Sequence, residues 1–180
     1  MKHMDNRFKA ILEHRRSIRK YTGETIPDEV LDVVVRTGLM SPRGRNLDTV
    51  ELIVIKDKSM LNLLSECRPV GPGILANADA AIAVIGRSDL SDVWTEDCAA
   101  AMTAMHIMAD SLEIGSCWVQ IRGRESKVES RTAEDVCRDA LGFPEEYRLE
   151  AILSLSVPAD RPEGKHFDDV DTNKIHYEKY

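Results

Sequence analysis

The stretch that decides the fold runs from Val93 to Ile121 and reads VWTEDCAAAMTAMHIMADSLEIGSCWVQI. In its first part, small and apolar side chains recur at steps of three and four residues, which is the period of an α-helix. These side chains belong to Ala99, Met102, Met105, Ala109 and Leu112. The pattern predicts one long central helix over residues 93–114, ended by Gly115, because glycine commonly follows the last turn of a helix. Residues 117–121 are then predicted to form a strand.

Helical and strand patterns alternate on both sides of this stretch. The other predicted helices cover residues 6–14, 58–66 and 132–141, and a further helix is predicted to begin within residues 25–29. Runs of β-branched and small apolar residues predict the other strands at 50–55, 78–85 and 151–157. This alternation is typical of the α/β and α+β classes.

Three further helix ends have predicted capping residues. Thr25 or Asp28 can cap the second helix, and Thr132 with Asp135 has the spacing of a capping box. Gly142 is predicted to end that last helix.

Length and charge limit the function. A chain of 180 residues fits a single domain, 1–180, and its net charge of −7 argues against a nucleic-acid or membrane surface as main partner. Residues 1–5 lack an apolar signal region, and no stretch approaches the length of a membrane span, so we expect a soluble cytoplasmic protein. The cysteines have no metal-ligand spacing and are interpreted as small buried core residues; no metal is expected.

The polar tail, residues 158–180, has few apolar anchors. A tail of this length is better explained if it wraps around a partner subunit than if it is a disordered end. We therefore expect a homodimer.

A basic cluster interrupts this acidic chain at residues 15–20, RRSIRK. In an extended segment, Arg15, Ser17 and Arg19 point the same way. Two guanidiniums and a hydroxyl on one face suit a phosphate, because arginine offers a planar fork of donors to oxyanions. The alternative is a solvated charged surface at the end of a helix.

Two further segments offer polar groups to a ligand. Residues 41–46, SPRGRN, form a predicted loop whose amides and side chains could border a ligand ring, although taken alone the segment is better explained as an ordinary loop. Trp118 lies where the long helix meets a strand and could be plain core. Hydrolytic, metal and dinucleotide-binding motifs are absent from the sequence, and His106 is interpreted as a structural residue.

Taken in order, four motifs resemble those of the FMN-dependent nitroreductase family. They are RRSIRKY at 15–21, SPRGRN at 41–46, EIGSCW at 113–118 and LGFP at 141–144. The family shows Arg-Arg-Ser-x-Arg, Ala-Pro-Ser-x-x-Asn, Glu-Leu-Gly-x-x-Trp and Leu-Gly-Ile-Pro at these places. The resemblance extends from about residue 6 to the end of the chain.

The resemblance implies an α+β fold with a central, mainly antiparallel sheet flanked by helices, in an intertwined homodimer with FMN at the interface. The FMN phosphate, ribityl chain and pyrimidine edge would lie on the basic cluster, and the loop at 42–46 would come from the other subunit. The residues implied to contact FMN are Arg15, Arg16, Ser17, Arg19, Pro42, Arg43, Asn46, Trp118, Val119, Gln120, Ile121 and Lys165.

The implied activity is ping-pong hydride transfer from NADH or NADPH, through FMN, to a nitroaromatic, quinone or similar electron-poor small molecule. No catalytic side chain is implied, because the cofactor carries the chemistry. Arg43 replaces the usual serine, and the family's Gln-Pro-Trp run is replaced by Asp48, Thr49 and Val50. These departures leave open a flavin carrier or sensor with little turnover. A third possibility is a structural dimer without cofactor.

Overall fold

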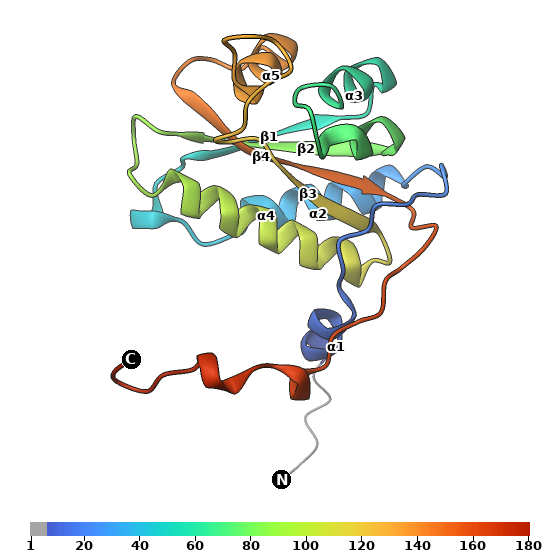
Figure 1. Ribbon diagram of the computed structural model, residues 1–180, viewed down its shortest axis with the longest axis vertical. Coiled ribbons are helices and arrows are strands. Elements are labelled where there is room, and N and C mark those ends of the chain that lie inside the picture. The colour runs from blue at the N-terminus through green and yellow to red at the C-terminus, as the bar shows by residue number, and fades with distance from the viewer. Residues whose placement is uncertain (1–6) are drawn as a thin grey trace.

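The computed structural model describes residues 7–180 and contains one four-stranded sheet (Figure 1). The strands are β1 (Val50–Ile55), β2 (Ala80–Arg87), β3 (Gly115–Gln120) and β4 (Tyr147–Ser156), in the order β1-β2-β4-β3. Each neighbouring pair is antiparallel, which confirms the predicted α+β fold with an antiparallel sheet.

Helices cover both faces of the sheet (Figure 1). On one face lie α2 (Asp28–Leu39) and α4 (Trp94–Ser111); on the other lie α3 (Lys58–Leu64) and α5 (Ala133–Leu141). One cluster of buried apolar side chains fills each interface, so the sheet is the middle of three layers. The first helix, α1 (Arg7–His14), contacts α4. Asn6, where this helix was predicted to begin, lies outside the described residues.

The central helix α4 packs closely against α2 because of one small residue. A Cβ added to Gly38 of α2 would lie 2.8 Å from the Met105 Sδ, so a larger residue there would have to displace the buried Met105 side chain. Met102 and Met105 are fully buried, as the helical spacing predicted. Burial of a methionine side chain contributes about 1.5–3 kcal/mol.

The predicted end of α4 at Gly115 is wrong. The helix stops at Ser111, and Glu113 takes the left-handed conformation at φ 60°. The Glu113 amide then donates to the Asp110 carbonyl, and the Ile114 amide to the Ala109 carbonyl, in the Schellman pattern of helix ends. Gly115 is instead the first residue of β3.

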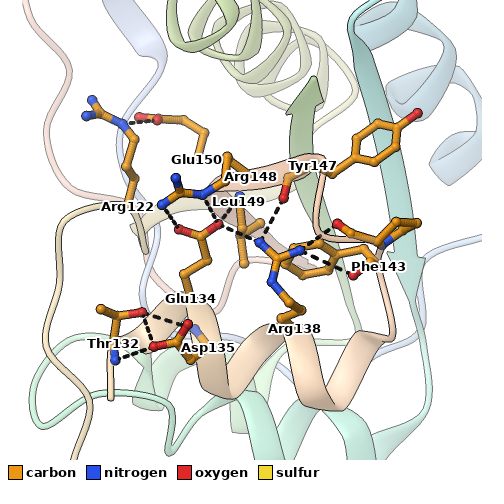
Figure 2. Close-up of polar contacts among 11 residues, drawn as sticks. Arg122, Thr132, Glu134, Asp135, Arg138, Phe143, Tyr147, Arg148, Leu149 and Glu150 are labelled. Carbon is orange, nitrogen blue, oxygen red and sulfur yellow. Dashed lines mark hydrogen bonds and ion pairs between the residues drawn. The ribbon is translucent and has the colours of Figure 1, made fainter. Parts of the chain in front are cut away.

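Helix α5 begins and ends as predicted. Thr132 and Asp135 form a reciprocal capping box, and Gly142 closes the helix in the left-handed region at φ 71°. The buried Glu134 carboxylate accepts hydrogen bonds from Arg138 and Arg148 and from a backbone amide (Figure 2). This carboxylate therefore ties α5 to the start of β4.

Other boundaries differ from the predictions. Strand β4 begins at Tyr147 rather than Ala151, because its first residues pair with the end of β2 beyond a register shift at Val84 and Ile85. The N-cap of α2 is Pro27, with no side-chain cap bond, so neither Thr25 nor Asp28 caps that helix.

The four cysteines are buried and unpaired, as expected of small core residues. Within residues 7–180, no helix is long and apolar enough to cross a membrane.

The tail first returns along the N-terminal segment and then extends away from the body of the molecule (Figure 1). Pro158 bridges Tyr21, and the Ala159 amide donates to the Lys20 carbonyl at 2.9 Å. Beyond Lys165 the residues are exposed and form only two short 3-10 turns. That the tail wraps around a partner remains a prediction.

Candidate functional site

The basic cluster is held in extended form against the edge strand β3. Ser17 forms a parallel bridge with Ser116, and the Ile18 amide donates to the Ser116 carbonyl at 2.9 Å. Ile18 itself is 1% exposed and packs on Gly115, where an added Cβ would lie 2.9 Å from the Ile18 Cγ2. With Ile18 turned inward, its neighbours turn outward.

This geometry gathers the predicted phosphate ligands around one pocket of about 260 Å³. The side chains that line it are four cations, one hydroxyl and one proline: Arg15, Arg16, Ser17, Arg19, Lys165 and Pro162. The tail delivers Lys165, whose amide donates to the Glu13 carbonyl at 2.8 Å. Cations grouped in this way repel one another, and a bound anion relieves that repulsion.

Helix α4 supplies the polar groups behind this pocket. The Arg15 Nη1 lies 2.9 Å from the His106 Nε2, and the His106 Nδ1 is hydrogen-bonded to the Ser116 hydroxyl. Burial, then the nearby Arg15 charge, lowers the pKa of His106 to about 4. One turn later, the buried Asp110 carboxylate pairs with His14 and Arg161.

The side chains of β3 alternate between the two faces of the sheet, and the half-buried Trp118 packs against the core cluster on the α2/α4 face. Trp118 and Gln120 share one face, where the Trp118 Nε1 donates to the Gln120 Oε1 at 2.8 Å. Val119 and Ile121 point into the core on the other face. Of these four predicted contacts, Val119 and Ile121 can therefore meet a ligand only through their backbone.

The buried carboxylate of Glu150 holds the Gln120 side chain in place. The Gln120 amide donates to the Glu150 Oε1 at 3.1 Å. Arg122 forms an ion pair with the same carboxylate (Figure 2). Glu150 is 4% exposed, and burial of its charge is tolerated because of these two partners.

The loop at 42–46 lies far from the basic pocket within one chain. The Gly44 amide donates to the Asp97 Oδ1 at 2.7 Å, near the start of α4, whereas His14 contacts Asp110 near its end. On a helix that rises about 1.5 Å per residue, Asp97 and Asp110 are separated by about 20 Å. The single chain thus does not bring Pro42, Arg43 and Asn46 to the basic pocket.

The departures from the family pattern are accommodated locally. The Arg43 guanidinium is paired with the Asp48 carboxylate and donates to the Leu39 carbonyl. The Thr49 hydroxyl is buried and donates to the Asp97 Oδ2 at 2.9 Å, while Val50 begins β1.

Sequence reasoning missed three residues that support the site. His106 and Ser116 contact the basic segment, and Glu150 holds Gln120. Glu150 could have been noticed as the one acidic residue inside the apolar run LEAILSLS. The spacing of His106 gave no sign of its partner, because Arg15 is distant in sequence.

Comparison with known proteins identifies the family. Residues 12–72 match the model of the nitroreductase family. A protein of Archaeoglobus fulgidus named NADH dehydrogenase/NAD(P)H nitroreductase is 33% identical over 171 residues, which cover 92% of this chain and 94% of the relative. The chain belongs to the nitroreductase family, as its four motifs predicted.

Solved structures agree over nearly the full chain. An FMN-dependent nitroreductase from Clostridium difficile R20291 superposes with a TM-score of 0.91 at 34% identity, over 94% of this chain and 98% of that one. A protein from Bacteroides thetaiotaomicron, also named NADH dehydrogenase/NAD(P)H nitroreductase, superposes with a TM-score of 0.88 at 27% identity, over 97% and 99% of the two chains.

Proposed function

We propose that this protein is an FMN-dependent NAD(P)H oxidoreductase that reduces nitroaromatics, quinones or similar electron-poor small molecules. The observation that carries the proposal is the basic pocket, in which Arg15, Ser17 and Arg19 on one extended segment converge with Lys165 of the tail.

The pocket fits the phosphate end of FMN. Its four cations match a phosphate dianion, and the Ser17 hydroxyl adds a neutral donor. Its volume of about 260 Å³ is below the roughly 300–1,000 Å³ of typical small-molecule sites, so it would hold only part of the cofactor. The rest of FMN would extend along β3 toward Trp118 and Gln120.

The remaining contacts are proposed to come from a second subunit. Because the loop at 42–46 lies at the opposite end of α4 from the basic pocket, Pro42, Arg43 and Asn46 would border the FMN of the partner chain. The exposed tail beyond Lys165 would wrap that partner. Exposed apolar side chains at Phe167, Val170 and Ile175 support this role.

The FMN held by these residues would supply the chemistry, which is ping-pong hydride transfer between NADH or NADPH and a second substrate. The protein's own residues bind the cofactor and polarise it. Arg19, exposed at the mouth of the pocket, is the proposed cation beside the pyrimidine edge, where positive charge favours the reduced form. No side chain needs to act as a nucleophile.

The first experiment is the absorbance spectrum of the purified protein, with and without added FMN. We expect flavin bands that stay with the protein through gel filtration, at about one FMN per chain. A colourless protein that ignores added FMN would contradict the proposal.

Turnover separates the oxidoreductase from the alternative of a flavin carrier or sensor. Steady oxidation of NADH or NADPH with a nitroaromatic or quinone acceptor is expected of the oxidoreductase. Retained FMN without such oxidation would support the carrier.

A further inference from the structure

The partner of Arg15 is unusual for an arginine in an acidic protein. The Arg15 Nη1 contacts the Nε2 of His106 at 2.9 Å, and His106 is only 8% exposed. A carboxylate is the common partner of a guanidinium in a partly buried position. Here the acceptor is an imidazole on α4.

The geometry determines the protonation of this imidazole. A guanidinium has only donors, so the His106 Nε2 must accept and carries no proton. The proton of the neutral ring is then on Nδ1, which donates to the Ser116 hydroxyl. The lowered pKa of His106 agrees with this neutral form, although Asp110 on the same helix acts in the opposite direction.

The arginine that contacts Asp110, one turn further along α4, differs from Arg15 in its partners. The Asp110 carboxylate pairs with the Arg161 guanidinium, which also lies 3.7 Å from Glu113. The charge of Arg161 is thus compensated by acidic groups. Arg15, which lines the basic pocket, is hydrogen-bonded to a neutral ring, and no carboxylate within residues 7–180 forms an ion pair with it.

His106 also contacts the strand that holds the basic segment. Its second partner is Ser116, which forms a β-bridge with Ser17. The Ser116 carbonyl also accepts a hydrogen bond from the Ile18 amide. A single imidazole therefore links the guanidinium, the edge strand and α4.

We infer that His106 is a positioning residue of the anion pocket, which holds the Arg15 guanidinium at the pocket wall through a neutral hydrogen bond and so leaves its full charge to a phosphate. This inference rests on the proposed function, since the phosphate is that of FMN. It predicts that a negative charge at position 106 weakens the site, whereas a neutral acceptor does not.

The test compares His106→Glu with His106→Gln, which differ in charge and hardly in shape. The affinities of the flavin-free dimer for FMN and for riboflavin, which lacks the phosphate, are measured by flavin fluorescence quenching. We expect His106→Gln to retain the preference of the wild type for FMN. His106→Glu should lose at least about tenfold in FMN affinity through its ion pair with Arg15, with riboflavin affinity unchanged.

The same pair of substitutions is repeated in an Arg15→Ala background. If the charge at position 106 acts through Arg15, the difference between Glu and Gln disappears there. Circular dichroism and gel filtration check that each variant is folded, and this second pair tests the coupling even if one single variant is unstable.

Four outcomes are decisive. Equal FMN affinities for His106→Glu and His106→Gln, or an equal loss of FMN and riboflavin affinity in His106→Glu, would overturn the inference. A difference that persists without Arg15 would overturn it as well. A wild-type protein that binds neither flavin would overturn the proposed function, and this inference with it.

Discussion

Ile18 and Gly115 lie in direct contact, so close that a Cβ on Gly115 would be 2.9 Å from the Ile18 Cγ2 and 3.2 Å from the Pro158 Cβ. This contact lets three segments meet at the edge of the sheet: the basic cluster, β3 and the start of the tail. The basic pocket depends on this contact, because the neighbours of Ile18 line that pocket.

Replacement of Gly115 by valine should therefore displace the basic segment. We expect a loss of about 1–3 kcal/mol in the free energy of unfolding, together with weakened FMN retention. Urea unfolding and the ratio of flavin to protein absorbance measure the two effects. Gly73→Ala is the control, since no atom lies within 4 Å of its added Cβ. Equal behaviour of the two variants would contradict the role of the contact.

The double variant Ser17→Ala with Arg19→Ala should lose FMN while the dimer persists. It removes one hydroxyl and one cation from the pocket and leaves the buried Ile18 in place. Flavin absorbance after gel filtration reports both properties. Lys20→Ala is a matched control, because Lys20 is exposed and pairs with Asp160 at 3.4 Å on the surface. Full flavin retention by the double variant would refute the site.

Glu134→Ala should destabilise the protein without changing the ligand preference of the basic pocket. The Glu134 carboxylate is 5% exposed, and its removal leaves Arg138 and Arg148 without their shared partner (Figure 2). Because Arg148 is half-exposed and Arg138 keeps backbone acceptors, the main cost is the buried Leu149 amide left without its acceptor, about 1–3 kcal/mol. Thermal unfolding measures this, with the exposed Glu145→Ala as control. A change below about 1 kcal/mol would indicate that the cluster is as weak as a surface ion pair.

The depressed pKa of His106 gives a pH dependence of stability. Because its folded pKa is about 4, against 6.5 as the ordinary value, the unfolded chain binds a proton more readily between these values. Stability contributed by the neutral ring is thus complete above pH 6.5 and falls as pH decreases toward 4. Urea unfolding of wild type and His106→Gln across this range isolates the effect, since the variant cannot titrate there. Parallel curves would contradict the assignment.

A chain that ends at Lys165 tests the role of the tail. It keeps Lys165, which lines the basic pocket, but removes the exposed segment that contains Phe167, Val170 and Ile175. We expect a folded monomer with weakened FMN binding, because the partner's loop is then lost. Light scattering after gel filtration gives the mass. A stable dimer with tight FMN would show that the tail is not needed for assembly.

Local pattern was enough to predict much of the fold. Period and capping chemistry placed the helices and strands, including the capping box of Thr132 and the left-handed Gly142, because these depend on neighbours within a few residues. The end of α4 escaped prediction, since Glu113 occupies the left-handed position and Gly115 is required by packing instead.

The candidate site also has a part that the sequence predicted and a part that it did not. The alternation of Arg15, Ser17 and Arg19 was readable from the sequence, because side chains in an extended segment alternate wherever that segment lies. The family resemblance had already implied that Lys165 contacts FMN, and the structure places it beside these residues. Only the tertiary structure decided that His106 supports Arg15 and that the loop at 42–46 lies at the far end of α4. The physical reason is that these relationships are contacts between segments distant in the chain. Their partners are chosen by packing around the sheet, and no local period carries that information.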